Sequence, residues 1–188
     1  MTRAVKLHLA SEFLPVLAFY SVSQVASFTT SAGVLAGTTA LATAASVYYE
    51  KRVPIVSVSS SLFVVGAGFL SYLFTAPAIL IVSDSLYYFL TAGVLWWYLR
   101  RGQFVLQWVF DGAFAMAPRG WYLLTWRWII ASFLAGVGNE MVRLFFSPEA
   151  WINYKLVKVL LIIIFVGSQF YLAKHYCAET ASPSSAAA

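Results

Sequence analysis

Polar residues divide the chain into apolar runs of about 20 residues, the length of helix that crosses a bilayer. The runs are continuous rather than alternating, which favours helices over a β-barrel. Six segments can be drawn, over residues 9–28, 32–49, 53–74, 76–99, 126–146 and 151–173. The first is the weakest, because it contains Glu12, Pro15 and Gln24. We therefore predict an all-α transmembrane bundle with six spans, or five if the first segment only dips into the membrane.

The composition is typical of an integral membrane protein. Of 188 residues, 61% are hydrophobic and only 10% are charged, and the mean hydropathy is +0.79. Soluble domains are about 25% charged, so this chain has too little polar surface to cover a water-soluble globule. We predict one transmembrane domain over residues 1–175. The small, polar residues 176–188 are expected to form a disordered tail.

The positive charges indicate orientation rather than nucleic-acid binding. The formal net charge is +5, and the cytoplasmic loops of membrane proteins carry an excess of lysine and arginine. Six spans with both chain ends in the cytoplasm put nine basic residues on that side: Arg3, Lys6, Lys51, Arg52, Arg100, Arg101, Arg119, Arg127 and Lys174. We therefore predict a cytoplasmic C-terminus.

The residues between the fourth and fifth segments predict a helix in the cytoplasmic interface. Polar residues recur every three or four positions and would share one helix face, namely Arg100, Gln103, Gln107 and Asp111. The other face would be apolar, with Phe104, Val105, Trp108, Val109 and Phe110. This pattern is typical of a helix that lies on the membrane surface. A seventh span would be short and would break the charge pattern.

The second segment is rich in small residues. Gly33 and Gly37 form a GxxxG pair, and Ala36, Ala40 and Ala44 form a second row. Small residues let helix backbones approach closely in lipid. We interpret Gly33, Gly37, Ala40 and Ala44 as packing positions inside the bundle, with a homodimer seam as the alternative.

The sequence carries none of the common catalytic motifs. A glycine-rich phosphate loop, a zinc-ligand spacing and a nucleophile elbow are all missing from it. Cys177 is the only cysteine, and His8 and His175 lie at opposite chain ends, where interfacial side chains are common. We therefore expect no enzymatic activity, no cofactor and no metal.

Charged residues inside apolar segments are the remaining candidates for chemistry. They are Glu12, Asp84, Glu140, Arg143, Lys155 and Lys158. Glu12 is interpreted as the interfacial start of the first helix. Ser83 or Asp84 is interpreted as a helix cap near the outer face.

The last hairpin holds the most informative group. With the outer turn near residues 147–150, Glu140 and Lys155 would lie at similar depth, roughly 10 Å below that turn. Arg143, three residues after Glu140, would share its helix face. We predict an ion-pair and hydrogen-bond cluster of Asn139, Glu140, Arg143, Lys155 and Lys158 that locks the hairpin. A substrate or proton site is the alternative.

Several stretches together resemble the intracellular septation protein A family, also called YciB or IspZ. They are "EFLPVLAFY", "YYEKRVPIVSVSSSLFVVGAGFLS", "DSLYYFLTAGVL", "APRGWYLLTWRW" and "NEMVRLFFSPEAWINYKLVKV". The most specific parts are the "FLP" start and the Trp-x-x-x-Lys element from Trp151 to Lys155. Many members have a Lys-Pro pair before the fourth span, where this chain has Ser83-Asp84. The family is usually drawn with five spans.

The resemblance implies a multi-pass inner-membrane protein of Gram-negative bacteria, without agreed enzymatic activity. It implies a role in envelope integrity and septation through membrane protein partners of envelope synthesis or division. A small transporter or lipid-handling protein that uses Glu140 and Lys155 is the second hypothesis. An integral membrane enzyme is the third, and the short loops argue against it.

Overall fold

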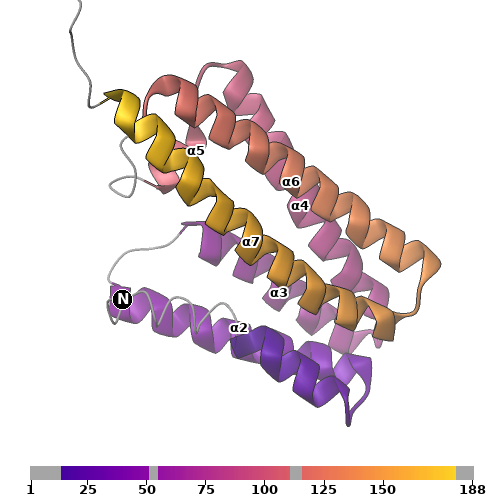
Figure 1. Ribbon diagram of the computed structural model, residues 1–188. Coiled ribbons are helices and arrows are strands. Elements are labelled where there is room, and N and C mark those ends of the chain that lie inside the picture. The colour runs from indigo at the N-terminus through magenta and orange to yellow at the C-terminus, as the bar shows by residue number, and fades with distance from the viewer. Residues whose placement is uncertain (1–13, 51–54, 111–115, 181–188) are drawn as a thin grey trace, which may run out of the picture. The chain divides into compact units, whose positions relative to one another are not determined.

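The computed structural model describes residues 14–50, 55–110 and 116–180, and these residues form helices joined by short turns (Figure 1). The first described helix, Leu14–Ser23, is called the N-terminal helix. The others are α2 (Phe28–Glu50), α3 (Ile55–Leu73), α4 (Pro77–Arg100), α5 (Val105–Val109), α6 (Pro118–Phe145) and α7 (Pro148–Thr180). The predicted all-α membrane bundle is confirmed.

Four helices in the described part of the chain are long and apolar enough to cross a membrane. These candidate spans are Phe28–Tyr48, Pro77–Arg100, Pro118–Phe145 and Pro148–Lys174. Two apolar helices are shorter, Leu14–Ser23 and Val58–Leu73. Ten residues of helix rise about 15 Å, half of a bilayer core of about 30 Å. Residues 9–13 of the predicted first span lie outside the described residues, so the choice between six and five spans stays a prediction.

Proline sets the start of three helices. Pro77, Pro118 and Pro148 are the first residues of α4, α6 and α7. Proline suits this position because the first N–H groups of a helix have no partner within it, and the fixed φ angle of the ring is already helical. The sequence prediction started the fifth segment at residue 126 and was wrong here. The helix begins at Pro118, so Arg127 lies inside α6 rather than at its end.

Two tight turns end α3 and α4 in the same way. Thr75 has φ 49° and Gly102 has φ 71°. At each turn the next N–H returns to a carbonyl five residues back, Ala76 to Ser71 at 3.1 Å and Gln103 to Tyr98 at 3.0 Å. These are Schellman motifs, which satisfy the last carbonyls of a helix and favour glycine at the left-handed position.

The turn at Gly102 corrects the predicted interfacial helix. Arg100 ends α4, so it does not share a helix with Gln103 and Gln107. Within α5, Leu106 is buried whereas Trp108 and Val109 are exposed. Asp111 lies outside the described residues. The place of this segment in the membrane interface stays a prediction.

Contacts group the chain into two compact units, and the single transmembrane domain over residues 1–175 stays a prediction. The first unit comprises Met1–Tyr87 and Gly136–Leu156, and the second comprises Tyr88–Ala135 and Val157–Ala188. Each unit therefore takes one part of α4, α6 and α7. The helix α7 extends to Thr180, so residues 176–180 of the predicted disordered tail are helical. Residues 181–188 lie outside the described residues.

Each unit has its own apolar core. The core of the first unit gathers the N-terminal helix, α2, α3 and parts of α4 and α7, through residues such as Phe19, Leu35, Ala67, Leu80 and Trp151. The core of the second unit joins α4, α5, α6 and α7 through residues such as Leu99, Leu106, Trp121, Leu124 and Leu172. The polar residues predicted as a cluster lie mainly in the first unit.

The turn at Thr75 yields a stability prediction. Replacing Thr75 by glycine should raise the free energy of unfolding by about 1 kcal/mol, because the left-handed conformation is costly for a residue with a Cβ. Gly102→Ala is the matched reverse change and should lower it by a similar amount. Thermal unfolding in detergent measures both. No change in the melting temperature of either variant would mean that the left-handed conformation at these turns has no effect on stability.

Candidate functional site: a buried amide and indole network

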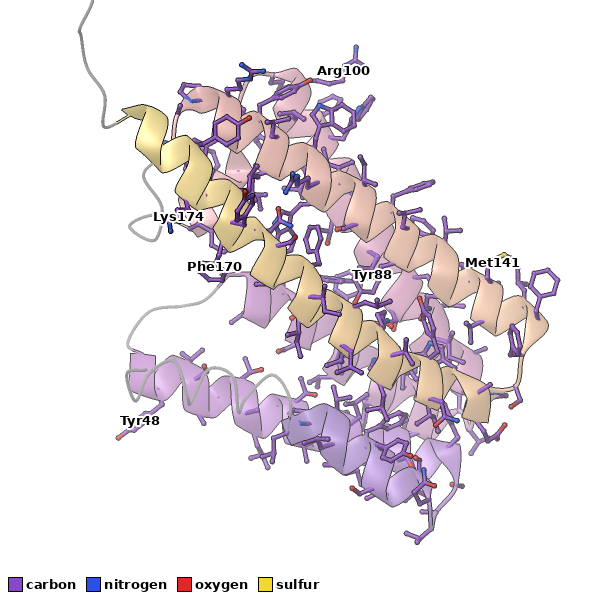
Figure 2. The ribbon with its side chains drawn as sticks, viewed as in Figure 1. Tyr48, Tyr88, Arg100, Met141, Phe170 and Lys174 are labelled. Carbon is purple, nitrogen blue, oxygen red and sulfur yellow. The ribbon has the colours of Figure 1, made fainter. Side chains whose placement is uncertain are left out.

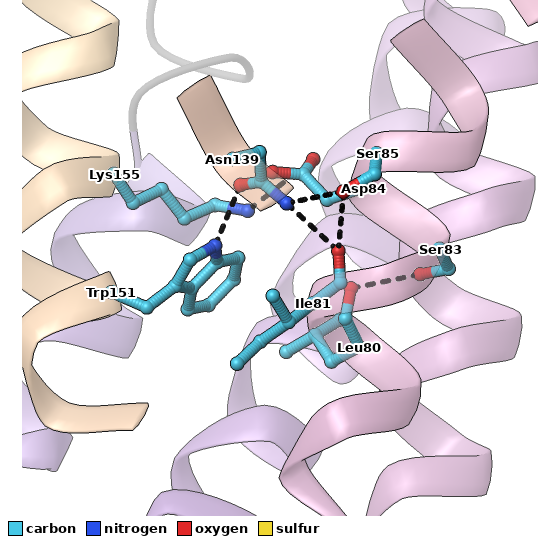
Figure 3. Close-up of polar contacts among 8 residues, drawn as sticks. All are labelled: Leu80, Ile81, Ser83, Asp84, Ser85, Asn139, Trp151 and Lys155. Atoms are coloured by element: carbon cyan, nitrogen blue, oxygen red, sulfur yellow. Dashed lines mark hydrogen bonds and ion pairs between the residues drawn. The ribbon is translucent and has the colours of Figure 1, made fainter. Parts of the chain in front are cut away.

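The candidate site is built around Asn139 of α6, which has no exposed surface (Figure 3). Its amide nitrogen donates to the Ile81 carbonyl at 2.9 Å and to the Ser85 hydroxyl at 2.7 Å, both on α4. Its amide oxygen accepts from the Trp151 indole N–H of α7 at 2.7 Å. An indole N–H can only donate, so the amide oxygen must face it. One side chain thus joins three helices.

Trp151 is also fully buried, and its ring extends the network to the N-terminal part of the chain. The ring centroid lies 6.1 Å from that of Phe19 in the N-terminal helix and 5.9 Å from that of Phe28 in α2. Phe19 and Phe28 meet edge to face at 6.0 Å. Such aromatic pairs add to the stabilisation that burial gives. Trp151 therefore links the N-terminal helix and α2 to the hydrogen bonds of Asn139.

Lys155 follows Trp151 by four residues, so the two side chains share a face of α7. Its ammonium lies 4.6 Å from the centroid of the Trp151 ring and 3.8 Å from the Asp84 carboxylate on α4. Both side chains of this ion pair are nearly buried. A lysine over an indole is stabilised by the negative face of the ring. Trp151 thus touches the charged pair as well as the amide.

Asp84 corrects two expectations. The sequence interpretation made it or Ser83 a helix cap, but α4 begins at Pro77 and Asp84 is its eighth residue. The sequence also set Glu140 opposite Lys155, whereas the acid that the structure brings to Lys155 is Asp84. The prediction considered only α6 and α7, the two helices of the last hairpin, whereas the acid that pairs with Lys155 lies on α4.

Glu140 pairs with Arg143 within α6. The Arg143 Nε donates to Glu140 Oε2 at 2.7 Å, and the terminal nitrogen lies 2.6 Å from the same oxygen. The Glu140 side chain is 25% exposed, and the Arg143 side chain is 32% exposed. This pair lies at the edge of the packed region, where partly exposed ion pairs contribute little to stability.

Lys158 falls in the second unit. It is buried, and its ammonium lies 4.7 Å from the centroid of the Tyr88 ring. The other four predicted residues, Asn139, Glu140, Arg143 and Lys155, belong to the first unit with Asp84. The predicted cluster is therefore divided between the two units.

Sequence reasoning missed Ser85; it listed Asp84 as a candidate but interpreted it as a cap, and it used Trp151 only as part of the family resemblance. A usable signal was present for Trp151, because its spacing from Lys155 places both on one helix face. For Ser85 and Asp84 the signal is weaker, since the distance of 54 residues between Ser85 and Asn139 gives no local pattern. Asp84 and Lys155 form the charged pair beside the network, and the Trp151 indole lies against the Lys155 ammonium.

The predicted packing residues of α2 are split between a covered and an open face. A Cβ built on Gly68 of α3 would lie 2.9 Å from the Ala32 carbonyl oxygen and 2.9 Å from the Ala36 Cβ, so α2 and α3 meet there. A Cβ on Gly33 would touch the Tyr72 ring at 3.4 Å. A Cβ on Gly37 would meet nothing within 4 Å, and Ala40 and Ala44 are exposed. Among the described residues, the contacts of these small residues with α3 therefore lie on the side of α2 that carries Ala32, Gly33 and Ala36.

The Asn139 network yields a matched pair of tryptophan variants. Trp151→Phe should lower the free energy of unfolding by about 1–3 kcal/mol, because it leaves the buried Asn139 oxygen without a donor. Trp128→Phe is the control, since the Trp128 indole nitrogen is buried and has no hydrogen-bond partner in the described structure. Its ring contacts with Phe110 and Phe165 would remain. Thermal unfolding in detergent should therefore show a larger loss for Trp151→Phe, and equal losses would contradict the network.

A double-mutant cycle tests the ion pair. Asp84→Asn and Lys155→Met should each destabilise the protein by about 3 kcal/mol, because each leaves one charge buried without its partner. The double variant should recover part of the loss. Glu140→Gln combined with Lys155→Met is the control, and the losses of stability of these two changes should add. Additivity in the Asp84–Lys155 cycle would show that this pair contributes no coupling.

Comparisons with a family model and with individual proteins point to the same family. The family described as "Intracellular septation protein A" matches residues 7–179. The "Inner membrane-spanning protein YciB" of Nitrobacter hamburgensis is 30% identical over 177 residues, which are 93% of this chain and 88% of that protein. Its namesake from Bradyrhizobium sp. (strain ORS 278) is 29% identical with the same coverage. No solved structure matches the chain. The resemblance seen in the sequence is confirmed, and the chain belongs to the intracellular septation protein A family.

Proposed function

We propose that this chain is a multi-pass inner-membrane scaffold that supports septation and envelope integrity by contacting membrane protein partners, without catalysing a reaction. The family description and the names of the relatives support the septation role and the inner-membrane location. The distribution of lysine and arginine supports a cytoplasmic C-terminus.

The observation that carries the scaffold proposal is the internal use of the Asn139 amide. Both of its hydrogen-bonding ends are occupied by side chains and backbone of the same unit. A substrate site needs polar groups that a ligand can reach. These groups instead hold α4, α6 and α7 together, which suits a rigid element that presents a surface to a partner.

The open face of α2 is the surface we propose for a partner. Gly37, Ala40 and Ala44 lie on it, with Leu41 beside them and 73% exposed. Tyr48 near the end of the same helix points away from the ribbon (Figure 2). Small residues allow a second helix to approach closely, where dispersion contacts supply the attraction in lipid. A membrane protein of envelope synthesis or division is the proposed partner, and a second copy of the chain is the alternative.

The Asp84–Lys155 pair favours transport or lipid handling as a second candidate function. Charged residues inside membrane spans often belong to ion or substrate pathways. In that case Asp84→Asn and Lys155→Met would leave the protein folded but inactive, and the double variant would stay inactive. In the scaffold proposal, loss of function follows loss of stability.

Two glycine variants test the proposed partner face. Gly37→Leu should leave the melting temperature in detergent unchanged, because a side chain there meets open space, but it should fail to restore septation in cells that lack the protein. Gly68→Leu is the matched control and should lower the melting temperature, because its side chain would collide with Ala32 and Ala36.

Crosslinking then separates the possible partners. With Cys177 replaced by serine, Ala40→Cys should crosslink to another membrane protein, and a crosslink to a second copy would indicate the homodimer. Full complementation by stable Gly37→Leu would contradict the use of this face.

A further inference from the structure

Two arginines at the C-terminal end of α4, the last helical residue and the one after it, each lie over a tryptophan four positions earlier. The Arg100 guanidinium carbon is 4.9 Å from the centroid of the Trp96 ring, and that of Arg101 is 4.5 Å from that of Trp97. The tandem sequence Trp-Trp-x-x-Arg-Arg produces both pairs, because positions four apart are neighbours on a helix. Each cation is thus held against an aromatic ring at the same end of the helix.

This geometry leaves the arginines able to bind an anion. A guanidinium that stacks on a ring uses its face, whereas its N–H donors point outward from its edge. Both arginines are exposed. The helix end does not need them as caps, because the carbonyls of Tyr98 and Leu99 already accept backbone hydrogen bonds from residues 101–103. Planar N–H pairs of this kind match the oxygens of a phosphate.

The rest of this end of the second unit is also positive. Its core brings together the end of α4, α5, the start of α6 and the end of α7. Arg119 and Lys174 are exposed on the last two of these segments, and Figure 2 shows Arg100 and Lys174 near the ends of their helices. The unit's sequence contains only two acids, Asp111 and Glu179, against six cations: Arg100, Arg101, Arg119, Arg127, Lys158 and Lys174.

Exposed aromatic rings lie next to the two arginines. Trp96 is 42% exposed, Trp97 is 53% exposed and Trp108 of α5 is 66% exposed. The Trp108 ring meets that of Tyr98 at 6.3 Å, which places α5 beside the end of α4. Tryptophan is enriched where a membrane's acyl chains meet its headgroups, because its ring is apolar and its N–H is polar. This surface therefore combines phosphate-binding groups with groups that suit the glycerol region of a lipid.

We propose that the end of α4, through Arg100, Arg101, Trp96 and Trp97, binds the phosphate headgroup of an anionic phospholipid, with Trp108 of α5 against its glycerol and acyl region. The two guanidinium groups hold the phosphate oxygens, and the tryptophan rings both position the arginines and contact the lipid. Two cations favour a lipid with net negative charge over a zwitterionic one, whose own ammonium group would be repelled.

The test is lipid selectivity of the full chain in detergent micelles. Purified protein is titrated with phosphatidylglycerol or phosphatidylcholine, and bound lipid is counted by native mass spectrometry. The wild type should prefer phosphatidylglycerol. Arg100→Gln with Arg101→Gln should lose that preference, by about five-fold for each arginine, the scale of one cation at an anionic lipid surface. Arg100→Lys with Arg101→Lys should lose part of it, because the charge remains but the planar donor pair is lost.

Matched variants exclude a general charge effect. Lys51→Gln with Arg52→Gln also removes two adjacent cations, but the residues four positions earlier are Val47 and Tyr48 rather than tryptophans. This control should keep the preference. Trp96→Leu with Trp97→Leu should weaken it while the net charge is unchanged. Melting temperatures of all variants show that each is folded.

Two outcomes would overturn the proposal. One is an equal loss of preference in the control pair at Lys51 and Arg52, which would indicate attraction by net charge alone. The other is full displacement of phosphatidylglycerol by soluble glycerol phosphate, which would mean that the site takes a free phosphate compound and not a lipid.

Discussion

The hydrogen bond from the Trp151 indole to the Asn139 amide is the interaction on which the first unit depends. In lipid, apolar surface gives no drive for helices to associate, so close packing and polar contacts between helices must hold them. Asn139 supplies hydrogen bonds to α4 and α7, and Trp151 supplies the aromatic contacts to the N-terminal helix and α2. Without that bond, the buried Asn139 oxygen on α6 and the buried Trp151 N–H on α7 would both lose their hydrogen-bond partner.

The sequence predicted the helices better than their contacts. Apolar length located α3 and α4 closely, because a span is defined by hydrocarbon thickness, whereas α2 begins four residues earlier than predicted and α7 continues seven residues further. The start of α6 was missed by eight residues, because the segment drawn from the sequence began at Trp126 and left Pro118 and the apolar residues Trp121 and Leu124 to the preceding connection.

The candidate site shows the same limit. Asn139 could be selected from the sequence because an amide inside an apolar segment must find partners. Its neighbour Arg143 was matched to Glu140 by helix spacing, a local property. The partner of Lys155 could not be found in this way, because Asp84 comes from a helix 71 positions earlier and only the fold brings it near. Local periodicity thus identifies pairs on one helix, whereas pairs between helices depend on packing.

The Trp151 ring joins two kinds of interaction that respond differently to charge. The bond to Asn139 is between neutral groups and does not depend on the protonation of any side chain. The contact with the Lys155 ammonium depends on charge, as does the pair with Asp84. The ring therefore takes part in a hydrogen bond between α6 and α7 and lies against a cation that is paired with α4.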